Sequence, residues 1–198
     1  MRAPSNFWSF GLALPLLCAC SAESGSPAPA KIEAATRTAE RACDQLQKEL
    51  GAALGEALGK GGPVAAIEVC QIRAPQIAAK VGAETTLKVG RTALGLRNEA
   101  NAPDAWERGI LEGFKQSMAS GTAPEGLTAT VVERSTAGHQ LRYMRAIATQ
   151  PVCVTCHGDE LLPELREELA RRYPDDKATG FKPGELRGAF TVTVALEP

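Results

Sequence analysis

The chain has 198 residues and a mass of 20.8 kDa, and its 22 Lys and Arg against 23 Asp and Glu give a formal net charge of −1. This near-balance argues against a nucleic-acid-binding protein, which would carry a basic excess or stripe. Hydrophobic residues make up 44% and charged residues 23% of the chain, so disorder throughout and collagen-like repetition are excluded and one folded domain is expected.

Residues 1–22 are typical of an export signal. Arg2 provides a positive start and is followed by an apolar run over residues 7–17. This run is too short for a membrane span, because a helix needs about 20 apolar residues to cross a bilayer. We therefore expect the mature protein on the periplasmic side of a bacterial envelope.

The end of this segment indicates lipid attachment. Residues 17–20, Leu-Cys-Ala-Cys, resemble a bacterial lipobox, in which Cys20 would become the lipidated first residue. Ordinary signal peptidase cleavage after Ala22 is the alternative. Ser21 favours sorting to the outer membrane over the inner membrane, and residues 23–30 have the Ser, Gly, Pro and Ala content of a flexible tether. The N-terminal lipid anchor is the only membrane contact that we expect.

Apolar spacing predicts two helices in the next part of the chain. Leucines at steps of four from Leu46 to Leu58 predict a helix over residues 31–58, which the Gly- and Pro-containing stretch that follows should end. A second helical stretch over residues 63–80 is expected to break or kink near Pro75, since proline lacks the N–H that a helix interior needs.

Beyond residue 85 the pattern changes between strands and helices. Strands are expected over residues 86–94, 127–135, 139–148 and 186–196, with a hairpin between the second and third, and helices over residues 103–120 and 161–172. This order predicts an α+β fold in which helices flank an antiparallel sheet.

The motif with the clearest chemistry is Cys-Val-Thr-Cys-His at residues 153–157. The thiols of Cys153 and Cys156 have the spacing that reaches the two vinyl groups of a porphyrin, and each can bond to one of them as a thioether. His157 then serves as an axial ligand of the iron. The motif predicts one covalently attached haem c, a cofactor that is assembled on the exported side of the membrane.

The motif also has two other possible interpretations, a redox dithiol and part of a zinc site. A Cys-x-x-Cys pair can act as a redox dithiol. It can instead supply half of a zinc site, for which His139, Cys43 and Cys70 are the available further ligands.

Residue types leave several candidates for the second axial ligand of a haem. They are His139, Met118, Met144, Cys43 and Cys70. His139 or a methionine comes first by residue type, because His/His and His/Met pairs are common in cytochromes c. Helical spacing turns Cys70 toward the core, where a small buried hydrophobe is its commonest role, and Cys43 is expected to be a partly buried thiol.

The propionates of a haem would need cationic partners, because buried carboxylates are stable only when paired. The sequence offers Arg91, Arg97, Arg142 and Arg145 for this role. An ordinary solubilising position on the surface is the alternative for each.

Four parts of the sequence also carry a resemblance to a known family. They comprise residues 66–70 with 74–78, 89–98 with 101–107, 153–158, and 173–181 with 184–190. Over about residues 31–196 the chain resembles the PAS-like c-type haem domain family, with one departure at Glu99, where the family usually has proline. The resemblance implies a PAS-like domain over residues 31–198 with a covalently bound haem c. It further implies Cys70 as the second axial ligand opposite His157 and therefore a six-coordinate iron.

Motif and resemblance together imply an exported, single-haem, c-type cytochrome-like protein in redox sensing or electron transfer, with a redox or signalling partner protein. A haem-based sensor of a diatomic gas is the alternative. A peroxidase-type enzyme is less favoured, because it needs a distal acid/base group and only His139 is spare. We expect no catalytic residue, and no kinase, chemoreceptor or transmembrane segment after the domain, which favours a redox role over a sensor with its own output.

Overall fold

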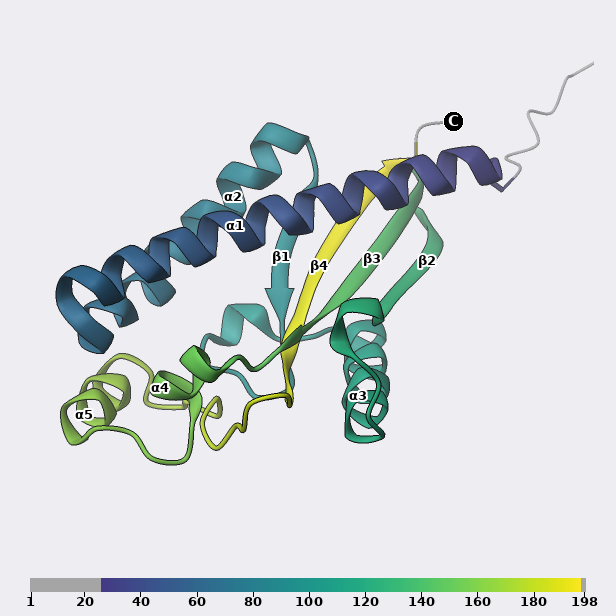
Figure 1. Ribbon diagram of the computed structural model, residues 1–198. Coiled ribbons are helices and arrows are strands. Elements are labelled where there is room, and N and C mark those ends of the chain that lie inside the picture. Colours follow the sequence, from purple (N-terminus) through teal and green to yellow (C-terminus); the bar gives the residue numbers. More distant parts are fainter. Residues whose placement is uncertain (1–25, 197–198) are drawn as a thin grey trace, which may run out of the picture.

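The computed structural model describes residues 26–196, which form one four-stranded antiparallel sheet with flanking helices (Figure 1). The strands are β1 (Lys88–Thr92), β2 (Thr128–Ser135), β3 (Gly138–Ala148) and β4 (Leu186–Leu196), in the spatial order β1-β4-β3-β2. The α-helices are α1 (Pro29–Glu68), α2 (Ala74–Thr85), α3 (Ala105–Ala119), α4 (Val154–His157) and α5 (Pro163–Arg172). The expected α+β fold is thus confirmed. The predicted export signal and Cys20 lie outside the described residues.

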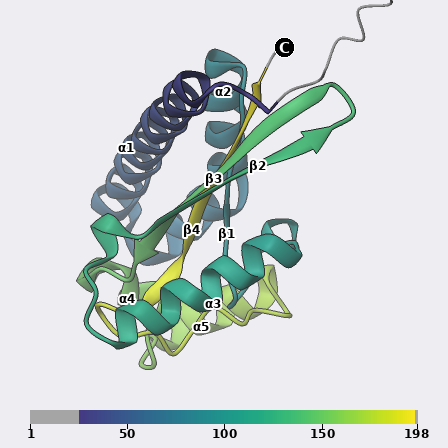
Figure 2. The same cartoon turned by 90° about the vertical axis from the view of Figure 1, so that its right-hand side faces the viewer.

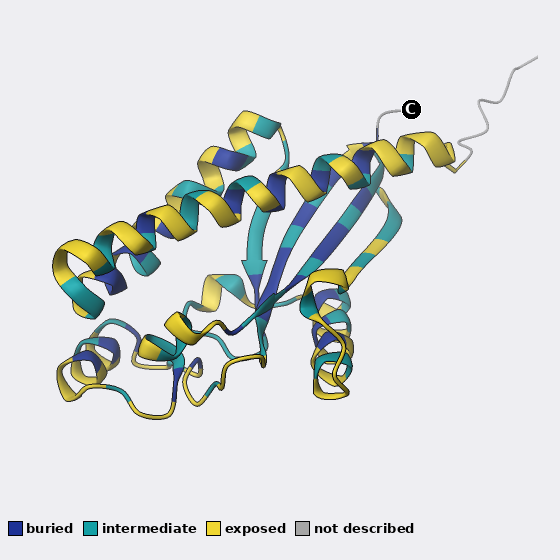
Figure 3. Ribbon diagram, viewed as in Figure 1, coloured by how far each residue is buried: buried dark blue, intermediate teal, exposed yellow. Residues whose placement is uncertain are grey.

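The long helix α1 covers one face of the sheet. Its small buried residues Ala35, Ala39 and Ala42 recur every three or four positions, so the helix can approach β3 and β4 closely. Leu46 joins them in a cluster with inward side chains of these strands, such as Tyr143. Figure 3 shows the outer side of α1 exposed along its length, whereas β3 and β4 beneath it consist mainly of buried and intermediate residues.

The helix α3 packs against the opposite face of the sheet (Figure 2). Met144 follows Tyr143 on β3 and therefore points to the other face, where it packs with Phe114 of α3. A capping box begins this helix: the Asp104 carboxylate accepts from the Glu107 N–H, and the Glu107 carboxylate accepts from the Asp104 N–H. The sheet is therefore held between two helices.

The two helices predicted before residue 81 are joined more closely than expected. The first runs into the second across a kink at Gly62, whose φ of 69° and ψ of −166° interrupt the helical backbone. The backbone then stays helical through Pro75, so the predicted break there is corrected. A π-helical turn, Val69–Arg73, precedes the proline, and its wider ring accommodates a residue that donates no N–H and crowds the preceding turn. Cys70 lies in this π-helical turn.

The remaining predicted elements are confirmed with small shifts at their ends. The hairpin joins β2 and β3, and its register pairs Ser135 with Gly138. The first strand is shorter than predicted and ends at Thr92, and α5 begins at Pro163. None of the helices between residues 26 and 196 combines the length and apolarity that crossing a bilayer requires.

Replacing the fully buried Leu46 with alanine should destabilise the protein by about 2–5 kcal/mol, because it leaves a cavity in the main core. Leu162, which is 54% exposed, is the matched control. Its replacement by alanine should change the free energy of unfolding by less than about 0.5 kcal/mol. Urea denaturation followed by circular dichroism measures both values. Equal losses would show that α1 does not pack on the sheet as described.

Candidate functional site

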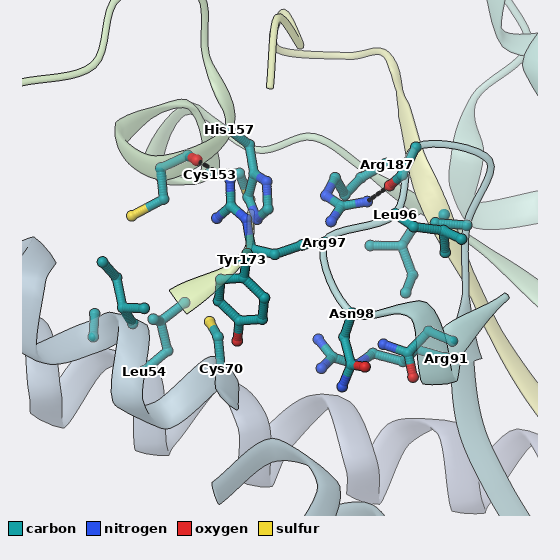
Figure 4. A pocket seen from close by; sticks show the side chains of 18 of the residues that line it. Leu54, Cys70, Arg91, Leu96, Arg97, Asn98, Cys153, His157, Tyr173 and Arg187 are labelled. Atoms are coloured by element: carbon teal, nitrogen blue, oxygen red, sulfur yellow. Dashed lines mark hydrogen bonds between the residues drawn. The ribbon is translucent and has the colours of Figure 1, made fainter. Parts of the chain in front are cut away.

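Three segments that are distant in the sequence supply most of the lining of one cavity at an end of the sheet. They are the end of α1 with the π-helical turn, the loop that follows β1, and the segment from Val152 to His157. The motif residues Cys153, Cys156 and His157 line this cavity together with Cys70 (Figure 4). Apolar side chains supply much of the remaining wall, namely Leu54, Leu58, Ala66, Ile67, Leu96 and Ile147. The cavity therefore combines thiols and an imidazole with an apolar lining.

His157 ends the single turn of α4, and its Nδ1 lies 2.6 Å from the carbonyl oxygen of Ala178. Because a carbonyl can only accept, Nδ1 carries the proton and donates, and Nε2 keeps its lone pair. Burial, together with the charges of Arg187 and Arg97, lowers the pKa of His157 to about 3, so the ring is neutral at neutral pH. A neutral imidazole with a free Nε2 is the form that binds a metal.

Cys70 reaches the cavity from the other side. Figure 4 shows its sulfur on the helical side of the cavity, whereas His157 and Cys153 come from the α4 side. Burial and the nearby Cys70 raise the pKa of the Cys156 thiol, so these two thiols lie within electrostatic reach of each other. These three cysteines and Cys43 are all free thiols. The cavity therefore presents three unbonded sulfurs.

The other candidates for a ligand role lie elsewhere. Cys43 and Met144 are fully buried in the packing on the two faces of the sheet, and burial raises the pKa of Cys43 to about 12. His139 lies near the start of β3 and Met118 near the end of α3. Of the five candidates, Cys70 alone lines the cavity with the motif histidine. Across residues 26–196, no group of three or more His, Cys, Asp or Glu side chains is arranged to hold a metal ion.

Three arginines, Arg91, Arg97 and Arg187, contribute positive charge to the cavity wall. Arg97 is paired with a carboxylate, since its Nη2 lies 2.8 Å from Asp176. Arg187 donates to the Gly95 carbonyl at 3.3 Å, and the Arg91 side chain makes no hydrogen bond or ion pair within residues 26–196. Burial lowers the pKa of both of these guanidinium groups, that of Arg187 to about 10. Two desolvated positive charges thus face the cavity without a carboxylate partner.

This placement separates the four candidate arginines, of which Arg91 and Arg97 line the cavity. Arg142 and Arg145 form ion pairs with acidic side chains outside the cavity and do not line it. Arg187 was missed, although it lies in the fourth stretch that carries the family resemblance. Its neighbour Gly188 explains its position: a Cβ there would lie 2.5 Å from the Thr92 carbonyl, so only glycine lets the start of β4 approach the loop after β1 this closely.

Residues 176–181, called the clamp segment here, fasten the motif to the rest of the cavity. N–H groups of this segment donate to the carbonyls of His157 and Gly158 at 2.9 and 3.1 Å. Another donates at 2.7 Å to the carbonyl of Leu96, in the loop after β1. The clamp segment therefore joins three of the four stretches that carry the family resemblance.

The fold and the cavity define a class of protein: a single-sheet α+β domain built around a Cys-x-x-Cys-His cavity. The model of the Tll0287-like family matches residues 23–195, and the chain belongs to this family. The match confirms the family resemblance that the four stretches carry.

Among solved structures, the crystal structure of the cyanobacterial heme-protein Tll0287 is similar, with a TM-score of 0.60. It is 22% identical and covers 86% of this chain and 99% of its own chain. At this level of identity the likeness shows the fold. No curated protein matches the chain.

Replacing Gly95 with alanine should disturb the cavity, because the new Cβ would lie 2.7 Å from the Lys177 carbonyl oxygen and 3.2 Å from the Phe181 ring. We expect a loss of about 1–3 kcal/mol, as at other overpacked positions. Gly109 is the matched control, since it is exposed on α3 with no atom within 4 Å of a new Cβ. Gly109→Ala should stabilise the protein by about 0.5–1 kcal/mol. Thermal unfolding measures both, and an undiminished stability of Gly95→Ala would contradict the close approach.

Proposed function

We propose that the protein is an exported, c-type cytochrome-like protein that carries one covalently bound haem c and acts in redox sensing or electron transfer. The meeting of Cys153, Cys156 and His157 with Cys70 at one cavity is the observation that supports this most. The similar fold belongs to a heme-protein, which supports the same cofactor. In this proposal the domain is PAS-like, and its sheet and α1 frame the haem.

The residues of the cavity fit a haem c. Cys153 and Cys156 are free thiols at the spacing that two thioether bonds require. His157 would bind the iron through Nε2, the nitrogen that the Ala178 hydrogen bond leaves free. Cys70 would bind from the opposite wall and complete a six-coordinate site. The haem would supply one-electron redox chemistry, and a thiolate ligand, as a strong donor, would hold its potential low.

The unpaired arginines fit the other end of the same cofactor. Propionates lie on the edge of a haem away from the two vinyl groups, and Figure 4 shows Arg91 and Arg187 at the end of the cavity away from Cys153. Two guanidinium groups without carboxylate partners match two propionates in number and charge. Arg97 would not be needed, because Asp176 already pairs with it.

The proposed location is the periplasmic side of a bacterial envelope, with the outer membrane as the destination and Cys20 as the lipid-bearing residue. The signal-like residues 1–22 support it. The attachment of haem c outside the cytoplasm supports it independently. An unidentified partner protein would exchange electrons with the haem or receive its redox signal.

Covalent attachment is tested by export together with the haem c maturation proteins, followed by denaturing gel electrophoresis and haem staining. Cys153→Ala/Cys156→Ala should lose the stained haem entirely, because no thioether can form. Cys43→Ala is the control and should keep it, since that thiol lies in the core away from the cavity. Haem stain retained by the double variant would contradict attachment at this motif.

Axial ligation by Cys70 is tested by the ferric absorption spectrum. Cys70→Ala should convert a low-spin spectrum to a high-spin one, because the sixth position loses its strong donor. Cys43→Ala should leave the spectrum unchanged. An unaltered spectrum of Cys70→Ala would show that another group binds the iron. Carbon monoxide that displaces a ligand readily from the unsubstituted ferrous protein would favour gas sensing over a redox role.

A further inference from the structure

A buried ion pair lies next to the motif. Arg97, in the loop after β1, and Asp176, in the clamp segment, are 2.8 Å apart, and their side chains are only 7% and 11% exposed. Burial of such a pair is weak evidence for stability, because apolar residues of similar size often serve as well or better. The contacts that the pair makes are therefore a better guide to its role.

These contacts converge on one residue of the clamp segment. Asp176 accepts a hydrogen bond from the Ala178 N–H at 2.8 Å, and Arg97 donates to the Ala178 carbonyl at 3.3 Å. Arg97 also donates to the carbonyl of Cys156 at 2.7 Å. The Ala178 carbonyl in turn is the acceptor for Nδ1 of His157. The ion pair thus holds both polar backbone groups of Ala178 and fixes them relative to the motif.

We infer that Arg97 and Asp176 are positioning residues that orient His157 through Ala178 and thereby tune the iron. The inference rests on the proposed haem function and deepens it. A hydrogen bond from Nδ1 raises the basicity of an imidazole ligand, so the placement of its acceptor sets how strongly Nε2 donates. Breaking the ion pair releases the Ala178 carbonyl, so the hydrogen bond from Nδ1 weakens and Nε2 would donate less electron density to the iron. The oxidised iron, which carries the larger positive charge, would then be less stabilised. The midpoint potential then rises.

Two matched variants of the exported, haem-loaded protein, Asp176→Asn and Asp104→Asn, test this. Each aspartate accepts from one backbone N–H and from one arginine, but Asp104 does so at the start of α3, outside the cavity. We expect a more positive midpoint potential for Asp176→Asn, with its haem still covalently bound, and the wild-type potential for Asp104→Asn. Equal potentials in all three proteins would overturn the inference.

Arg97→Lys provides a second variant in case Asp176→Asn folds poorly. It keeps the positive charge, but an ammonium lacks the planar fork that lets one side chain hold Asp176, Cys156 and Ala178 at once. We expect the same upward shift of the midpoint potential. The wild-type potential in this variant would count against the inference.

A further readout needs no haem. Nitrogen-15 NMR of the histidine-labelled, haem-free Cys153→Ala/Cys156→Ala protein reports the tautomers of both histidines of the chain, His139 and His157. We expect a single Nδ1–H tautomer for His157, and a mixture of tautomers when Asp176→Asn is added. An unchanged tautomer would overturn the inference. A wild-type protein that takes up no haem would contradict the proposed function alone, because this readout would still decide the role of the ion pair.

Discussion

The hydrogen bond from Nδ1 of His157 to the Ala178 carbonyl is the interaction on which the cavity depends. The motif histidine sits on a single helical turn, and a turn this short has no stability of its own because helix nucleation is unfavourable. The imidazole therefore takes its orientation from the clamp segment, which also fastens the backbone of the motif. The same bond decides the tautomer and leaves Nε2 free. A metal ligand needs a fixed ring orientation and a free lone pair, and this hydrogen bond provides both for His157.

The facing wall is built in a different way. The helix α1 spans 40 residues, packs on the sheet through its alanines, and continues past the core to the cavity. The π-helical turn at its end adds a residue to one turn, so it changes the direction of every later side chain relative to an unbroken α-helix. Cys70 lies in that turn and is thus aimed by a helix anchored in the core. Under the proposed function, backbone hydrogen bonds support one axial ligand and helix packing supports the other.

Local sequence patterns predicted the elements well, because each helix and strand shows its own apolar periodicity. The motif was recognisable for a similar reason, since its chemistry is contained in five consecutive residues. Helical spacing also predicted that Cys70 faces the core. That Cys70 lies opposite His157 depends on packing between distant segments, and only the family resemblance predicted it. The arginines show most clearly what local sequence patterns cannot predict. Arg142 and Arg145 find acidic partners elsewhere, whereas Arg187 enters the cavity because the start of β4 lies against the loop after β1.

The most direct test of the central claim is the absorption spectrum of the protein exported with the haem c maturation proteins, in the ferric state and after reduction with dithionite. We predict a low-spin ferric Soret band and sharp bands on reduction, because His157 and Cys70 would fill both axial positions of one haem c. A high-spin ferric spectrum would contradict a filled sixth position. A protein without any haem spectrum would contradict the claim itself and return Cys153 and Cys156 to the role of a redox dithiol.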